Sequence, residues 1–265
     1  MAPASTGRHR TGNVVRRVNL RTGLLTTPAG GGLWGLGGDG GLARQAQLAL
    51  LEGVSVDRSG NLLATDGSSV RVVAAASGAF YGQVMKAGDI YTGAGGGTSL
   101  RNGVLGASAL LKHPHAVTVD GAGNIVVGDQ LATRLRVVAA RTGTFYGVPM
   151  RAGHVYMIAG NRRTWSSGAA EPATRAQFFP NWPITFDNGN LVAADSHSTS
   201  TSLHTSVRLV PARSGSFFGI AMKAGHLYRI AGDGQEDFSG NGTSARKSGI
   251  GQISRQLAAR SSASR

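Results

Sequence analysis

The chain has 265 residues, a formal net charge of +14 and no cysteine, which excludes disulfides, thiol catalysis and thiolate metal sites. Its 41 glycines and its low share of charged residues, 15%, favour an all-β fold rich in turns. No apolar stretch is long enough to cross a bilayer, and no signal peptide is visible at the start.

The chain begins with a polar stretch, residues 1–13, for which the sequence predicts disorder or a degenerate repeat end. Residues 14–30, VVRRVNLRTGLLTTPAG, match the last two strands of the repeat that follows, and they therefore predict half of a repeat unit. The repetitive body is expected to run over 14–250. Residues 251–265, GQISRQLAARSSASR, predict a disordered basic tail.

Three complete repeat units are expected, at about 50–95, 113–160 and 180–232. The second unit contains four short β-rich segments, AVTVD, NIVVGD, RLRVVAA and HVYMIAG, and turns rich in Gly and Asn divide them. Short runs of Val, Ile and Tyr between such turns predict antiparallel strands. Four-stranded units that recur along a chain indicate the blades of a β-propeller.

The motifs of these units resemble the NHL repeat. The second unit reads PHAVTVDGAGN, then GD, then RLRVV and finally YMIAG, and the loop GGDGGLARQAQL at 37–48 resembles a connector of bacterial NHL proteins. The repeated FYG extension resembles a variety frequent in filamentous actinobacteria. The resemblance covers almost the whole chain and implies an NHL-type β-propeller of four-stranded antiparallel blades. It implies little about activity, because propellers have many functions.

The repeat gives about three and a half blades, fewer than the 4–8 blades of closed propellers. Three arrangements are open. The segment GIGQIS at 249–254 completes the half blade; two chains join into a larger ring as a homodimer; or the chain is a fragment that remains an open arc.

Polar residues that recur in every unit are expected to be structural. One Asp opens the first turn and should accept backbone hydrogen bonds there, and another Asp ends the second strand and should pair with an Arg of the third strand. These residues are Asp57, Asp120 and Asp187; Asp66, Asp129 and Asp195; and Arg71, Arg136 and Arg208. The FYG hairpins are expected to form apolar clasps that carry a basic ridge of Lys86, Arg151 and Lys223.

Function is expected where the repeats differ. Glu52, His115 and Trp182 occupy the same slot before the innermost strand, which opens toward the channel mouth of a propeller, and together they predict a site for a small polar ligand. The alternative is that all three are ordinary solvated loop residues. The loops between the second and third strands add recognition candidates. These are Arg134, His197 and His204.

No catalytic residue, metal ligand or cofactor is assigned, because HExxH, GxSxG and acidic calcium-loop motifs are absent from the sequence. The leading hypothesis is a non-catalytic scaffold that binds a protein or polymer partner. The resemblance suggests one alternative, a lyase or lactone hydrolase with a metal in the central channel. The basic charge suggests another, binding of RNA or an anionic polymer. The location is open: cytoplasmic as written, extracytoplasmic if the start is truncated.

Overall fold

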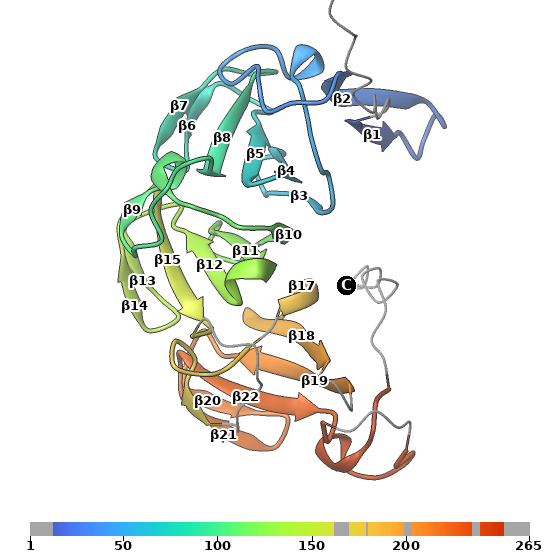
Figure 1. Cartoon of the computed structure of the whole chain (residues 1–265), viewed down its shortest axis with the longest axis vertical. Coiled ribbons are helices and arrows are strands. Elements are labelled where there is room, and N and C mark those ends of the chain that lie inside the picture. The colour runs from blue at the N-terminus through green and yellow to red at the C-terminus, as the bar shows by residue number, and fades with distance from the viewer. Residues whose placement is uncertain (1–12, 162–169, 179, 199–202, 235–238, 252–265) are drawn as a thin grey trace, which may run out of the picture.

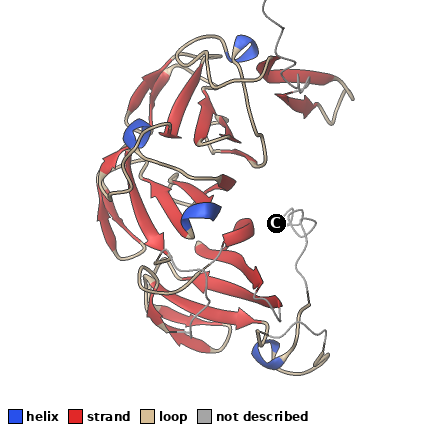
Figure 2. Ribbon diagram, in the orientation of Figure 1, coloured by secondary structure: helices blue, strands red, loops and turns tan. Residues whose placement is uncertain are grey.

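The computed structural model describes residues 13–161, 170–178, 180–198, 203–234 and 239–251. The side chains of 180–183, 196–198 and 203–204 also lie outside the described part. The predicted disordered ends fall outside it as well, apart from Asn13 and Gly251. Strands dominate the described residues, and the helical elements there are short 3-10 turns (Figure 2). These turns are η1 (Ala43–Gln45), η2 (Gly106–Ser108), η3 (Gln130–Ala132) and η4 (Ala245–Lys247).

Three antiparallel sheets form the body of the molecule, and each contains the four strands of one blade. The first blade consists of β3 (Val54–Val56), β4 (Leu62–Asp66), β5 (Ser69–Val73) and β8 (Ile90–Gly95). The second consists of β10 (Pro114–Val119), β11 (Ile125–Asp129), β12 (Arg134–Val138) and β15 (His154–Ala159). The third consists of β17 (Pro180–Asp187), β18 (Asn190–Ser198), β19 (Leu203–Val210) and β22 (His226–Ala231).

Short accessory strands complete the architecture. β9 (Val104–Leu105) and β16 (Glu171–Pro172) add a fifth strand to the outer edges of the second and third blades. The strands β1 (Asn13–Val18) and β2 (Leu25–Gly32) pair only with each other in the described structure and form the N-terminal half blade. Each complete blade also carries a hairpin: β6 (Gly78–Phe80) with β7 (Gln83–Met85), β13 (Gly143–Phe145) with β14 (Val148–Met150), and β20 (Gly215–Phe217) with β21 (Ile220–Met222).

The blades follow one another in an open arc (Figure 1). The first strands of the blades, β3, β10 and β17, lie toward its concave side, and the hairpins lie toward its convex side. The half blade stands beside the first blade, at the opposite end of the arc from the third. The all-β fold of four-stranded antiparallel propeller blades, predicted from the sequence, is confirmed, and the described residues form an open array.

The recurring Asp shapes the turn between the first two strands. The Asp57 carboxylate accepts hydrogen bonds from the backbone N–H groups of Ser59 and Asn61 at 2.9 and 2.8 Å. Between them Gly60 has a φ of +83°, which is unfavourable for a residue with a side chain. Asp120 organises its own turn in the same way. These bonds explain why the DRSGN and DGAGN sequences form tight hairpins.

The accessory hairpins are tied to these turns by a tyrosine. Tyr81 and the glycine after it both have positive φ, as a two-residue type I′ hairpin requires. The Tyr81 hydroxyl donates a hydrogen bond to the Asp57 carboxylate at 2.7 Å, and Tyr146 donates to Asp120 at 2.9 Å. In the third blade the equivalent residue is Phe218, which is 59% exposed. The expected apolar clasp therefore differs in the third blade, where no hydroxyl is present to make this bond.

The apolar core lies between blades. One cluster joins Val70, Val72 and Tyr81 of the first blade to residues of the second, including Val138 and Val155. Another joins the second blade to the third through a corresponding set of residues: Leu135, Val137, Tyr146, Leu191, Val210 and Leu227. Because both faces of the middle strands are covered by neighbours, their sequences are almost continuously apolar.

Two local expectations need correction. His115 and Trp182 lie within β10 and β17 and not before them, because these inner strands pair from Pro114 and Pro180 onward through a register shift. The long polar segment 196–206 was expected to be a loop, yet much of it is strand: His197 and His204 face each other in the β18–β19 ladder. Its serines and threonines are compatible with strand, and no glycine interrupts the ladder.

Candidate functional site

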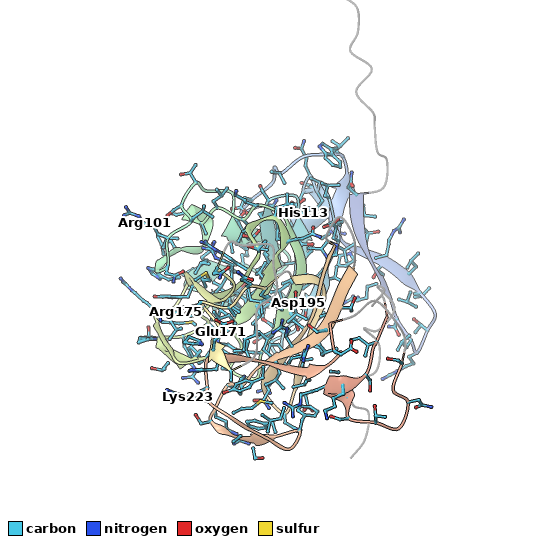
Figure 3. All side chains as sticks on the ribbon, turned by 60° about the horizontal axis from the view of Figure 1, so that its bottom comes forward. Arg101, His113, Glu171, Arg175, Asp195 and Lys223 are labelled. Atoms are coloured by element: carbon cyan, nitrogen blue, oxygen red, sulfur yellow. The ribbon has the colours of Figure 1, made fainter. Side chains whose placement is uncertain are left out.

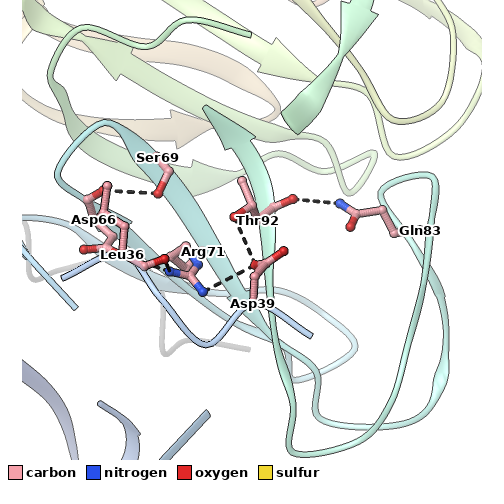
Figure 4. Close-up of polar contacts among 7 residues, drawn as sticks. All are labelled: Leu36, Asp39, Asp66, Ser69, Arg71, Gln83 and Thr92. Atoms are coloured by element: carbon pink, nitrogen blue, oxygen red, sulfur yellow. Dashed lines mark hydrogen bonds and ion pairs between the residues drawn. The ribbon is translucent and has the colours of Figure 1, made fainter. Parts of the chain in front are cut away.

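The recurring Asp and Arg of the first blade form a buried network (Figure 4). Arg71 lies 3.2 Å from the Asp66 carboxylate and 3.3 Å from that of Asp39, and it also donates to the Leu36 carbonyl. Burial raises the pKa of Asp66, against the opposing effects of the Ala49 backbone N–H and of Arg71. The network links the second and third strands to the connector at 36–39, so it holds the sheet and its connector together.

The second blade carries the same residue types but a different arrangement. The Asp129 carboxylate accepts the backbone N–H groups of Lys112 and His113 at 2.9 and 3.1 Å. Arg136 donates to the Leu110 carbonyl at 3.4 Å, and within the described residues it forms no ion pair with Asp129 at 4.0 Å or less. Burial raises the pKa of Asp129 and lowers that of Arg136. The pairing expected from the repeat is thus not made here.

In the third blade the recurring Asp and Arg form an ion pair, as in the first blade. Arg208 Nε lies 3.2 Å from the Asp195 carboxylate, and both side chains are buried. Burial lowers the pKa of Arg208, although Asp195 acts in the opposite direction. Asp187 of this blade accepts a hydrogen bond from the Asn188 side chain at 3.2 Å. In all three blades these repeated polar residues contact the protein's own backbone and side chains.

Glu52 and His115, which the sequence placed in one slot of neighbouring blades, lie close together. The Glu52 carboxylate is 4.0 Å from His115 Nε2 and 3.2 Å from Nε2 of His113, and the two imidazoles meet edge to face with centroids 5.9 Å apart. The three side chains are 21%, 11% and 25% exposed, in the order Glu52, His115, His113. We call these three residues the Glu–His cluster. It lies where the inner strands β3 and β10 begin.

Gln130 fixes one imidazole of the cluster. Its side-chain oxygen lies 2.7 Å from His113 Nδ1, opposite the contact with Glu52. Because the facing Gln130 atom is an oxygen, Nδ1–H is the donor in this arrangement; a neutral His113 with its proton on Nε2 satisfies both contacts only when the Gln130 amide is turned over, so that its nitrogen faces Nδ1. A protonated His113 satisfies them when the Gln130 carbonyl accepts. The cluster therefore offers donors and acceptors on partly exposed side chains, which suits hydroxyl or amide groups of a polar ligand.

Sequence reasoning missed His113. The available signal was the HPH triplet, in which two imidazoles are separated by a proline. His113 reaches Glu52 across the junction between two blades. An alignment of the repeats cannot reveal such a contact, because it compares each residue with the residue at the same position of another repeat and not with the residues that lie beside it in space.

The other candidates are placed less fully. The side chains of Trp182, His197 and His204 lie outside the described residues. Arg134 is not in an exposed loop: it is 8% exposed at the start of β12 and donates to the Leu100 carbonyl at 3.4 Å. The turn before it is compact, because η3 reverses the chain and Thr133 adopts a φ of +52°. Burial of Arg134 follows from this short connection.

No group of three or more His, Asp or Glu side chains among the described residues has an arrangement that could hold a metal ion. No helix in the described part is long and apolar enough to span a membrane.

Comparisons with known proteins give only structural likenesses, since no protein-family model and no curated protein matches the sequence. A protein of unknown function from Bacteroides thetaiotaomicron has a TM-score of 0.48 and 13% identity over 76% of this chain and 40% of its own. A gluconolactonase from Xanthomonas campestris has a TM-score of 0.39 and 14% identity over 73% and 49%. An auxiliary nutrient binding protein from Bacteroides ovatus has a TM-score of 0.38 and 10% identity over 74% and 39%.

This chain spans less than half the length of each of these three structures. The propeller architecture rests on the sheets described above.

Proposed function

We propose that the chain is a non-catalytic binding scaffold of NHL-type blades, and that it binds a protein or polymer partner through the Glu–His cluster. The observation that carries the proposal is the contrast between two sets of polar residues. Those shared by every blade, such as Asp66 and Asp195, are buried in internal contacts. Glu52, His113 and His115 belong to single blades and remain partly exposed. A scaffold of repeats places its specific contacts where the repeats differ.

The test is a screen of neutral oligosaccharide and peptide arrays, followed by calorimetry on each hit. Glu52→Gln removes the carboxylate charge and His115→Ala removes an imidazole, and each is expected to weaken binding by about tenfold or more, since one lost hydrogen bond to a charged group is worth ~1.5–3 kcal/mol. Val84→Ala, at a residue that is 84% exposed on the hairpin of the first blade, is the control and should bind as the wild type does. Equal binding by all variants would place the contact elsewhere.

A second candidate surface lies along the outer side of the arc. Lys86, Arg151 and Lys223 are exposed, and each follows the hairpin of its blade. Their backbone N–H groups each donate to a tyrosine hydroxyl of the same blade, at 2.9, 3.0 and 2.8 Å. The backbone of the three residues is thus held in the same way in each blade, and we call the three the basic row.

Further cations lie on the same outer side (Figure 3). Arg101, Arg175 and Lys223 lie along one edge of that view, with Glu171 close to Arg175, and His113 lies away from them. Such a row suits an anionic polymer such as RNA, whose affinity should fall steeply with added salt. Substitution of the three cations of the basic row by alanine should reduce both the affinity and its salt dependence. Affinity that is insensitive to salt would argue against this surface.

The enzymatic alternative stays a prediction from the family resemblance. It would use Glu52 and His115 as ligands of a divalent metal. Calorimetric titration of the protein with Mg²⁺, Ca²⁺ and Zn²⁺, repeated with Glu52→Gln, tests this alternative directly, because carboxylate loss should abolish a heat signal that arises at the cluster.

A further inference from the structure

The two junctions between complete blades follow one rule. In each, one face of the earlier blade, which we call the donor face, carries the hairpin tyrosine and packs on the opposite face of the next blade, the acceptor face. Tyr81 of the first blade and Val138 and Val155 of the second belong to one such junction. Tyr146 of the second blade and Val210 and Leu227 of the third belong to the next. The four acceptor residues are no more than 1% exposed.

In both of these junctions a glycine on the acceptor face receives the tip of the preceding hairpin, whereas Gly88 of the first blade, which follows a half blade without such a hairpin, has no such contact. A Cβ atom added to Gly153 would lie 2.9 Å from the Tyr81 carbonyl oxygen, and one added to Gly225 would lie 2.6 Å from that of Tyr146. The hairpin tips therefore approach the backbone of the following blade, and only glycine allows this approach. The contact occurs at equivalent positions in both junctions.

The half blade has an acceptor face that its neighbours in the described chain do not cover. Val18 and Leu25 pair across β1 and β2, as Val138 and Val155 pair across β12 and β15. Val18 is 53% exposed and Leu25 is 56% exposed, whereas the equivalent residues of the second and third blades are buried. Gly23 is the equivalent of Gly153 and Gly225, and a Cβ atom there would meet nothing within 4 Å.

The third blade has the opposite feature, an uncovered donor tip. Tyr81 and Tyr146 are 5% and 4% exposed in their junctions, but Phe218 at the same position is 59% exposed. A Cβ atom on the adjacent Gly219 would meet nothing within 4 Å, whereas one on Gly82 would lie 2.8 Å from Gly153 Cα. The described part of the chain thus presents an open acceptor face on the half blade and an open donor tip on the third blade, and two internal junctions show that such surfaces fit each other.

We propose that two copies of the chain associate head to tail, with the Phe218 tip of the third blade seated at Gly23 against Val18 and Leu25 of the half blade of the other copy. The apolar character of Phe218, Val18 and Leu25 supplies the attraction, which grows with the apolar area that the contact removes from water. Because donor and acceptor differ, the contact is heterologous, and it either closes a ring or continues as a chain of copies. Each copy carries a formal net charge of +14, so added salt should strengthen the association by screening repulsion.

The experiment measures mass by light scattering on a sizing column at several protein and salt concentrations. The wild type is expected at twice 27.2 kDa or a higher multiple, more so at high salt. Phe218→Asp and Leu25→Asp place a charge in the contact, and each variant alone should be monomeric. Val84→Asp, at a residue that is 84% exposed on the first hairpin, is the matched control and should assemble like the wild type.

A mixture of the two monomeric variants separates this contact from any other. Phe218→Asp keeps an intact acceptor face and Leu25→Asp keeps an intact donor tip, so the mixture should form a dimer through one remaining junction and nothing larger. Circular dichroism spectra equal to those of the wild type establish that the variants fold. A wild type that is monomeric at every concentration and salt, oligomers that persist in both variants, or a mixture that stays monomeric would each overturn the proposal.

Discussion

Replacement of Tyr146 by phenylalanine tests how the accessory hairpins are held. The substitution removes one hydroxyl from a side chain that is 4% exposed, and it keeps the ring that packs in the junction between the second and third blades. The lost interaction is the 2.9 Å hydrogen bond to the Asp120 carboxylate. Hydrogen bonds to charged groups contribute about 1.5–3 kcal/mol, so Tyr146→Phe should lower the free energy of unfolding by that amount.

The loss of stability in Tyr146→Phe is limited, because Asp120 keeps its other hydrogen bonds. Its carboxylate still accepts the N–H groups of Ala122 and Asn124 and the Asn124 side-chain amide, so no buried charge is left without partners. A loss well above about 3 kcal/mol would therefore require the hairpin itself to come away. Urea unfolding followed by circular dichroism measures the change, with the midpoint compared at constant slope.

The chain supplies both a parallel and a control. Tyr81→Phe removes the equivalent 2.7 Å bond to Asp57 and should cost a similar amount. Phe218→Tyr adds a hydroxyl at an exposed position, beside a turn that is one residue shorter, and should change stability by less than about 0.5 kcal/mol. If Tyr146→Phe is as stable as the wild type, the hydrogen bond does not hold the hairpin and the reasoning fails.

The same pair of proteins should show a characteristic pH dependence. Burial, together with the Asp120 charge, raises the pKa of Tyr146 above its ordinary value of 10.0. The unfolded chain therefore ionises this tyrosine at a lower pH than the folded chain does, and the stabilisation present below pH 10 is lost as the pH rises above it. The advantage of the wild type over Tyr146→Phe should accordingly shrink above about pH 10.

Three further substitutions test other parts of the structure. Asp66→Asn leaves the 1% exposed guanidinium of Arg71 without its buried partner and should cost about 3–5 kcal/mol in thermal or urea unfolding; a cost below ~1 kcal/mol would mean that Asp39 carries the contact. Burial raises the pKa of Asp129 above 3.8, so ionisation of this carboxyl disfavours the folded state. The free energy of unfolding of the wild type, relative to that of Asp129→Asn, should therefore fall as the pH rises from about 3.8. A difference between the two proteins that does not change with pH would contradict this. Gly160→Ala brings a Cβ atom into collision with the Thr133 carbonyl oxygen at a φ of +94° and should lower the free energy of unfolding by more than about 1 kcal/mol. Gly189→Ala, at a φ of +84° with no atom within 4 Å of the added Cβ, should cost less. Equal losses would show that backbone strain alone determines the cost.

The blade architecture could be predicted because the sequence states it repeatedly. Asp57 and Asp120 recur before Gly-containing turns, and the turn hydrogen bonds that these residues predict are present. Hydrophobic runs between such turns predict strands that are covered on both faces. The turn residues and the recurrence of the unit along the chain both predict the same strands, so the fold follows from either observation.

The contacts between blades could not be predicted in this way. Asp129 and Arg136 match Asp66 and Arg71 letter for letter, yet they form no ion pair at 4.0 Å or less in the described structure. Both backbone N–H groups of the connector that enters the blade bind Asp129 Oδ1, and Oδ2 makes no hydrogen bond in the described structure. The path of that connector depends on packing against the neighbouring sheet, which the repeat motif does not encode.

The candidate site could be predicted only in part, because its contacts also cross between blades. Glu52 and His115 were found because they differ from each other at one repeat position, whereas His113 joins them through its side-chain contact with Glu52 of the neighbouring blade. The bond from Tyr146 to Asp120 links two positions 26 residues apart within one blade. Both halves of it recur in the sequence, but their contact depends on how the hairpin folds back.

The open arc also has a consequence for local opening. Each blade is supported only by its neighbours, so its resistance to opening depends on how many of its faces are covered. The second blade is clasped from both sides, through Val138 on one face and Leu135 on the other, and both residues are 1% exposed or less. Amide protons of β11 and β12 should therefore exchange with solvent most slowly, and exchange should quicken toward the half blade and the third blade as the ends fray.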